Sequence, residues 1–595
     1  MNQIVQKNFL NSLINLTQQN LSATSSAFDL ARSAGLAFET DGNFESRTQL
    51  TGTNQDDIVI IGGNLIGGNN KATSIALQDG NDTVTIGGDV IAHDMQSISI
   101  TGGTGSKTIH VNGGMDLDHS KVDVIIGSTN NISYINELTI DGEIKAKHAN
   151  TNLLLTGEDN TITINNGIHI EDNSYLEIYS SSRMDLIDIK GDISIDLSTL
   201  SIGSYAIDRS DRSAYTEVNI DGNISVSADG DIDISLYTNN SSIVCKDLTA
   251  TDGSSIAFAT YHRYSSSINE FFIEGNITIT DYSSFDIFSN ARVDVEVSGS
   301  MIVQDGSVID IDINGGDVTF LGGILNTDSY VGLVSDANSE TNLYIEGDVT
   351  AGHSISPEHN MAINSFLFMG GNVVFTLMGD LTATGNSENE IETSNGNDQI
   401  FITGDISVAN GGKNSIYTDY GDDIISLNGH IDAGALNIDA GEGNDTLVLS
   451  AVTQRTFEAN YKEWLVDLSS TGSLSQCGIE TIKLDVRGVR MDKLGWFTDI
   501  INQANADGAH IAVEDKAGHQ LINPSAYLAQ NNDTHNPIND VLDHYAPAAA
   551  AAQPKAFAEN VAAPSADAFA APHFDNNSFL HEMEQQAQVH AAAVA

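Results

Sequence analysis

A five-residue pattern, apolar–x–Gly–x–apolar, recurs along most of this chain and constrains its fold more than any other feature. Examples are IGGNL at 61–65, IKGDI at 189–193 and LNGHI at 427–431. Thirteen of fifteen central residues are Gly, and ten of the fourteen intervals between centres are 24 or 25 residues. The centres lie at 63, 88, 113, 142, 166, 191, 222, 246, 275, 299, 323, 347, 379, 404 and 429. A unit of constant length therefore repeats, with loop insertions.

The residues beside each centre alternate between apolar and polar, as in Thr83-Val84-Thr85-Ile86, which predicts short strands with one buried face. One unit is too short to bury its own apolar face, so neighbouring units must stack. A coil of about 24 residues holds three short strands and three corners. We therefore predict an all-β protein: a parallel β-solenoid (β-helix) of about 15 coils, roughly 70 Å long at the strand spacing of a sheet. The alternative is an antiparallel array such as tandem sandwiches.

The ends of the chain depart from the repeat. Residues 1–50 are predicted to form a helical N-terminal cap, and 51–450 the solenoid. Residues 451–530 contain both tryptophans and two predicted helices, near 454–464 and 491–506, which indicates a C-terminal cap or small α/β domain. Residues 531–595 are rich in Ala with several Pro, which is typical of a disordered tail, with a short helix near 577–592.

The composition excludes several classes of function. The formal net charge is −57, which opposes binding to nucleic acid phosphates. Two cysteines give neither a disulfide framework nor a zinc motif, and no stretch is apolar enough to span a membrane. The N-terminus lacks the basic and apolar regions of a secretory signal peptide, so an exported protein would need another route.

Polar residues form two further columns in the repeat. The first Asx column, six residues before the centre, holds Asp or Asn in ten of fifteen units. Its members are Asp57, Asp82, Asn136, Asn160, Asp185, Asn240, Asn269, Asp317, Asp398 and Asp423. The second Asx column, one residue after the centre, is mostly Asp or Asn: Asn64, Asp89, Glu143, Asp192, Asn223, Asp247, Asn276, Asp348, Asp380 and Asp405. Either column can serve turns, because Asp and Asn bond their own backbone.

Adjacent carboxylates also suggest a cation. Two charges one strand spacing apart repel by about 0.9 kcal/mol in water and by more when partly buried. Ca²⁺ is a hard ion that binds six to eight oxygens. We therefore predict calcium as a cofactor, with turn formation as the alternative. The predicted metal ligands are Asp57, Asp82, Asp398, Asp422, Asp423 and Asp445.

Four stretches carry a resemblance to a known family. GNDTV (80–84), GNDQI (396–400), GDDII (421–425) and GEGNDTLVL (441–449) resemble the calcium-binding nonapeptides of repeats-in-toxin proteins. The resemblance implies calcium between coils and export by type I secretion, with an uncleaved C-terminal signal and folding outside the cell. The spacing differs from the family's, because the motif recurs here every 25 residues or so instead of every nine.

A third group of residues suggests a binding surface between 175 and 292, where half of the ten arginines lie. Arginine with aromatic rings suits an acidic sugar chain. The predicted glycan- or partner-binding residues are Arg183, Arg212, Tyr215, Tyr261, Arg263 and Arg292. The alternative is that these arginines pair with the surrounding acids and that the tyrosines stack along the edge of the coils. If the chain were an enzyme, Asp185, Asp188 and Asp211 would be the candidate carboxylates.

The sequence contains no nucleophile elbow, P-loop, HExxH or zinc-binding spacing. We therefore expect a non-catalytic, secreted or cell-surface structural protein that acts in a surface layer, filament, matrix or adhesion. Its partners would be other copies of itself or surface glycans. The alternatives are a carbohydrate-active β-helix enzyme (lyase, hydrolase or epimerase) and a secreted toxin.

Overall fold

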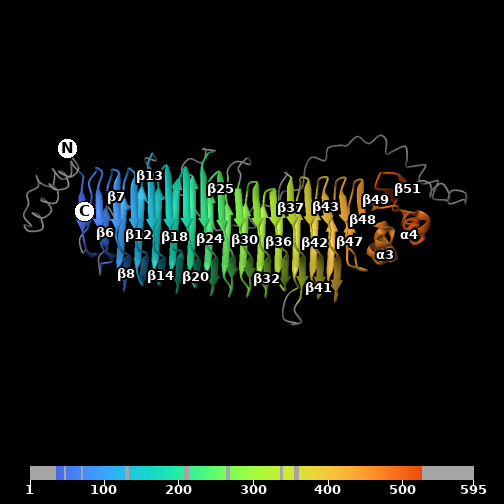
Figure 1. Ribbon diagram of the computed structural model, residues 1–595, viewed down its shortest axis with the longest axis horizontal. Coiled ribbons are helices and arrows are strands. Elements are labelled where there is room, and N and C mark those ends of the chain that lie inside the picture. Colours follow the sequence, from blue (N-terminus) through green and yellow to red (C-terminus); the bar gives the residue numbers. More distant parts are fainter. Residues whose placement is uncertain are drawn as a thin grey trace, which may run out of the picture. The chain divides into compact units, whose positions relative to one another are not determined.

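The computed structural model describes residues 35–524, apart from the short gaps 46–48, 69–71, 128–132, 207–212, 263–268, 336–339 and 354–360. Each coil contributes one strand to each of three parallel sheets. A typical coil consists of β7 (Asp82–Ile86), β8 (Val90–His93) and β9 (Ser97–Gly102). The next coil repeats it as β10 (Lys107–Val111), β11 (Met115–Asp118) and β12 (Lys121–Gly127), each parallel to its predecessor. Figure 1 shows the coils stacked along the long axis.

The predicted solenoid is confirmed. The first sheet, A, runs from β1 (Ala37–Thr40) through β46 (Ile424–Leu427). Sheet B has fifteen strands, from β2 (Phe44–Glu45) to β44 (Ile406–Ala409), and sheet C has sixteen, from β3 (Leu50–Thr51) to β47 (Asn437–Asp439). These counts give about fifteen complete coils. The first coil starts at Ala37, inside the range that the sequence analysis gave to the N-terminal cap (1–50).

A single apolar core fills the coils. Strand residues alternate between buried and partly exposed, as in β7, where Val84 and Ile86 point inward and Thr83 and Thr85 outward. Inward residues from the three sheets, such as Val84, Val90 and Ile98, are at most 1 % exposed. Fully burying one such side chain contributes about 1.5–3 kcal/mol. Because each coil buries its inward face against the coils on both sides, the stability of the solenoid depends on stacking.

The geometry of one corner explains why Gly precedes the second Asx column. The Oδ1 atom of Asn64 accepts the backbone N–H of Asp89 in the next coil, and Asp89 Oδ1 in turn accepts that of Gly114. A Cβ on Gly88 would lie 2.0 Å from Asn64 Oδ1. The same bond recurs from Asp348 to Asp380, Asp405 and His430. Gly therefore leaves room for the side chain that holds the corner of the next coil.

The C-terminal end is closed by the predicted small α/β cap. Sheet A continues through β48 (Asp445–Ala451), β49 (Ile479–Val486) and β50 (Ala512–Asp515), all parallel, and ends with the antiparallel β51 (Gln520–Ile522). Two helices connect these strands: α3 (Gln454–Thr471) and α4 (Gly495–Ala506). The predicted helices at 454–464 and 491–506 are confirmed, with α3 longer and α4 starting later.

Helix α3 packs against the last coil. Its Tyr461 hydroxyl donates to the carbonyl oxygens of Leu427 and Ser450, and the Trp464 indole N–H donates to Leu436 O at 2.9 Å. Phe457, Tyr461 and Trp464 are fully buried. The helix thereby covers the open end of the apolar core.

Several predictions lie outside the described residues. The helical segment proposed for the N-terminus falls mainly on 1–34, and the Ala-rich tail at 531–595 lies beyond residue 524. Within the described residues, no helix is long and apolar enough to cross a membrane, as the sequence analysis expected.

Candidate functional site

The first Asx column lies inside the solenoid, at or next to the residue that begins each strand of sheet A. Asp57, Asp82, Asp398, Asp423 and Asp445 are all at most 2 % exposed. In four of them, Oδ1 accepts the backbone N–H of the same position in the preceding coil: Asp82 from Asp57, Asp398 from Val373, Asp423 from Asp398, and Asp445 from Asp423. One oxygen of each of these four carboxylates therefore accepts a structural hydrogen bond that needs no ion.

Two assignments to this column need correction. In β25 (Asn240–Cys245) and β34 (Gly316–Phe320), the strand register differs by one residue from the position counted back from the centre. Ser241 pairs with Thr216, and Gly316 with Thr341, at the buried position. Asn240 and Asp317 are therefore partly exposed neighbours of the column and not members of it.

The two N-terminal members have partners in the protein: Asp57 has hydrogen-bond donors, and Asp82 Oδ2, which accepts no hydrogen bond, has an ammonium beside it. Asp57 accepts hydrogen bonds from the N–H groups of Leu36 and Thr53 and from the Thr53 hydroxyl. Asp82 Oδ2 lies 3.3 Å from Lys107 Nζ, and both side chains are fully buried. Burial raises the pKa of Asp82 to about 6, against the opposing effect of Lys107. The residues here do not fit a calcium ion, because the Lys107 ammonium already neutralises the column.

Lys107 is not among the site residues that the sequence analysis proposed. Its Nζ donates to the carbonyl oxygens of Gly80, Thr104 and Gly105 at 2.7, 2.9 and 3.1 Å. The signal in the sequence was its place, since Lys107 stands six residues before a centre, where Asp or Asn usually stands.

The C-terminal members differ, because no lysine or arginine within the described residues acts on them as Lys107 acts on Asp82. Asp398, Asp423 and Asp445 stand in three consecutive coils, at the start of or just before β43 (Gln399–Ile402), β46 and β48. The Oδ2 atom of each is buried and lacks a hydrogen-bond partner. We call these three residues the carboxylate trio. The next strand continues it with Glu480, whose Oε2 accepts the Asp445 N–H at 2.8 Å.

The charged form of the trio is electrostatically unfavourable. Burial raises the pKa of Asp445 to about 7, and the charges of Asp423 and Glu480 act in the same direction. Burial also raises the pKa of Asp398 to about 6 and that of Asp423 above its ordinary value. Side-chain hydrogen bonds with Thr393 and Thr418 oppose these shifts at Asp398 and Asp423 without cancelling them. A proton or a cation would stabilise the buried oxygens, and a set of hard carboxylate oxygens is the donor chemistry of Ca²⁺.

Asp422 lies apart from the trio, on the surface. Its Oδ1 accepts the backbone N–H and the side-chain amide of Asn444, both at 3.0 Å. The same exposed position in the preceding coil is Asn397, which accepts the N–H of Asp422. Asp422 therefore belongs to a further chain of corner bonds, and the structure does not bring it into the predicted metal site.

The described members of the predicted arginine and tyrosine set lie where strands of sheet C lead into strands of sheet A, and the two arginines lie beside acids. Arg183 lies beside Glu158 and Asp159, and Arg292 lies 3.2 Å from Asp317. Tyr215 begins β22 (Tyr215–Ile220) in sheet A, whereas Tyr261 follows β27 (Ser255–Thr260) in sheet C. Arg212 and Arg263 lie outside the described residues. The two described arginines thus pair with acids, as the alternative anticipated.

The outer face of sheet C carries an aromatic stack that the sequence analysis found only in part. Tyr237, at the end of β24 (Asp231–Tyr237), stacks on Tyr261 with ring centroids 4.5 Å apart. Tyr205 and Phe288 extend the stack at 5.9 and 5.3 Å. The signal was the coil spacing, which places these aromatics at or next to equivalent positions of neighbouring strands.

Half-buried acids share this face. Burial raises the pKa values of Glu177, Asp233 and Asp286. Asp185, a candidate catalytic carboxylate, is instead buried in the core, where it accepts hydrogen bonds from Ser180, Ser182 and Ser204. Asp188 is partly exposed, 3.4 Å from Lys190, and Asp211 lies outside the described residues.

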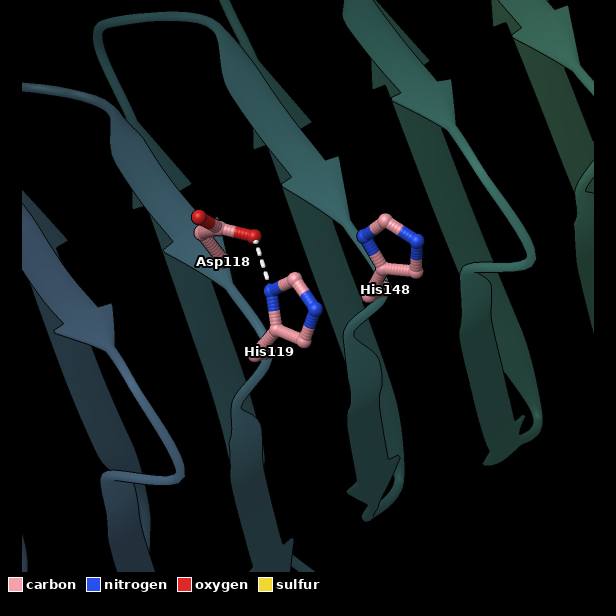
Figure 2. A group of neighbouring side chains, drawn as sticks. All are labelled: Asp118, His119 and His148. Carbon is pink, nitrogen blue, oxygen red and sulfur yellow. Dashed lines mark hydrogen bonds and ion pairs between the residues drawn. The ribbon is translucent and has the colours of Figure 1, made fainter.

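A group of side chains that the sequence analysis missed lies at the corner between sheets B and C. Asp118 ends β11 and His119 follows it, and His148 occupies the equivalent corner of the next coil, after β14 (Ile144–Lys147) (Figure 2). His119 Nδ1 lies 2.6 Å from Asp118 Oδ1. The sequence could have predicted this pair, since His119 and His148 both stand six residues after a centre.

Comparison of the chain with known protein families, with curated proteins and with solved structures finds no match. The class of protein is therefore defined by the fold alone: a parallel β-solenoid repeat protein with a C-terminal α/β cap. The resemblance to repeats-in-toxin proteins rests on the four short motifs.

Proposed function

We propose that this protein is a secreted or cell-surface structural rod, which acts through assembly or adhesion in a surface layer, filament or matrix. The observation that carries this proposal is the continuity of the stack. The three sheets keep their parallel pairing from the first described coil to the cap. Stacked repeats of this kind present long regular surfaces, which suit contacts with other copies or with extended partners.

Calcium is proposed as the cofactor of the carboxylate trio, where Asp398, Asp423 and Asp445 would supply the oxygens. When bound, the ion supplies positive charge and ligand bonds and performs no reaction. The chain's own contribution is to hold three buried carboxylates one strand spacing apart. A millimolar-calcium extracellular medium would occupy such sites, and the charge of −57 suits an ion-rich medium. Export by the type I route remains part of this proposal.

A second candidate function is binding of, or action on, a carbohydrate chain. The observation that favours it is the aromatic stack of Tyr205, Tyr237, Tyr261 and Phe288 beside half-buried acids on sheet C. Aromatic faces pack against sugar rings, and a carboxylate of raised pKa can act as a proton donor. Catalysis would need two such groups beside one substrate bond.

One experiment separates the two candidates. Fluorescently labelled protein is added, with calcium, to producing cells that lack their own copy, and the variant Tyr237→Ala/Tyr261→Ala is compared with the wild type. The structural proposal predicts that both proteins attach to the cells, because assembly does not need the aromatic stack. Attachment of the wild type alone would favour glycan binding, and attachment of neither would contradict the structural proposal.

A further inference from the structure

The cluster at the corner between sheets B and C consists of Asp118, His119 and His148. The solenoid register brings these residues together, since Asp118 pairs with Lys147 and the two histidines follow these paired residues. Their ligand atoms lie within 4.8 Å of one another. The two imidazole rings stack with centroids 4.2 Å apart, as Figure 2 shows.

The backbone fixes both histidines in the same unusual conformation. His119 and His148 have φ values of 46° and 48°, in the left-handed region that few residues other than Gly adopt. The His119 N–H donates to Lys147 O at 2.9 Å, which ties one corner to the next. Equivalent corners elsewhere hold Asp172, Asp252, Asp305 and Asp328. The histidines are thus held next to each other by rigid elements, as a binding site requires.

The charged groups around the cluster are compatible with a bound cation. Lys147 directly precedes His148, but its Nζ lies 3.0 Å from Glu171 and 2.6 Å from Asp172 in the following coil. The Asp118 carboxylate contacts His119 and is 42 % exposed, so an ion can reach it from solvent.

From this arrangement we propose a binding site for a borderline divalent transition-metal ion of the Zn²⁺ or Cu²⁺ class, with Asp118, His119 and His148 as ligands. Imidazole nitrogen with one carboxylate is a donor set that Zn²⁺ and Cu²⁺ prefer and Ca²⁺ does not. The site is separate from the carboxylate trio and does not depend on the proposed structural function.

The ligand atoms can converge on one ion without a change of backbone. Zn–N and Zn–O bonds are about 2.0–2.2 Å long, so the exposed side chains need only turn about their own bonds. A neutral imidazole carries its proton on either nitrogen, so Nδ1 of His119 is free to bind the ion once the proton is on Nε2. Three protein ligands leave a fourth position open to water.

The test is calorimetric titration of the full-length chain with ZnCl₂ at pH 7.5, with an excess of calcium present. The wild type is expected to bind one zinc ion. His119→Ala and His148→Ala should each lower the affinity for this ion at least about tenfold, because even outer partners of a metal ligand contribute 10–100-fold to affinity. The matched control is His110→Ala, which removes another exposed histidine with a carboxylate partner, Asp141 at 2.8 Å, and is expected to leave this affinity unchanged.

Electron paramagnetic resonance with Cu²⁺ gives an independent readout of the ligands. The wild type is expected to show two nitrogen ligands and His148→Ala one. Zinc affinity and copper spectra unchanged in His119→Ala/His148→Ala would overturn the proposal, because the ions would then be bound elsewhere on the chain. Absence of zinc binding by the wild type would overturn it equally.

Discussion

Replacing Lys107 with methionine is expected to destabilise the N-terminal coils by about 3–5 kcal/mol at neutral pH, the cost of breaking a buried ion pair. The substitution keeps most of the side-chain volume but removes the partner of Asp82 and a donor to three carbonyl oxygens, of which only Thr104 O keeps another donor, the Gly80 N–H. Coils of a solenoid can unfold in part, so the effect is best measured by amide hydrogen exchange in β7 and β10.

The double variant Lys107→Met/Asp82→Asn tests the physical reason for this loss. Removing the carboxylate should restore part of the protection, since no buried charge is then left unpaired. The loss in Lys107→Met should also shrink near pH 5, because the Asp82 pKa, about 6 beside Lys107 and higher without it, leaves the carboxyl protonated there. Equal loss in the single and double variants at both pH values would show that packing, and not the ion pair, is responsible.

The carboxylate trio is expected to make stability depend on pH and calcium together. Because the folded pKa values of Asp398 and Asp445 are about 6 and 7, against 3.8 for an ordinary Asp, the folded state holds protons that the unfolded state loses. Without divalent ions, the midpoint of thermal unfolding should therefore fall as pH rises from about 4 to above 7. Calcium should raise this midpoint far more at pH 8 than at pH 5. At a calcium concentration one hundred times the Kd of a site, the gain in the free energy of unfolding is about 2.7 kcal/mol.

The variant Asp398→Asn/Asp423→Asn/Asp445→Asn should lose both responses. Asn keeps the oxygen that accepts the neighbouring N–H but carries no charge. The matched control is Asp348→Asn/Asp380→Asn/Asp405→Asn, which removes the same charge from the exposed second Asx column. A calcium response that survives in the trio variant and disappears in the control would place the ion on the surface column instead.

The sequence predicts the solenoid well because its spacing is a local property. Gly at each centre and alternation such as Thr83–Ile86 specify a corner and a strand, and stacking then follows from the lack of any other way to bury the apolar face. The helices of the cap are also predictable, from the end of the repeat and the apolar periodicity around Trp464.

The sites are harder to predict, because they depend on which residues the coils bring together. Asp57 and Asp398 look alike in the sequence, yet Lys107 neutralises one end of the column and nothing neutralises the other. Arg183 and Arg292 were assigned to one binding surface, but each lies beside its own acid. His119 and His148 are 29 residues apart, so they meet only when the insertion in that coil is taken into account.

The most direct test of the structural function is negative-stain electron microscopy of the purified full-length chain, with millimolar calcium and again with a chelator. The proposal predicts filaments, sheets or lattices of laterally or terminally joined rods in calcium, and their loss in chelator. Separate rods in both conditions would contradict assembly as the function.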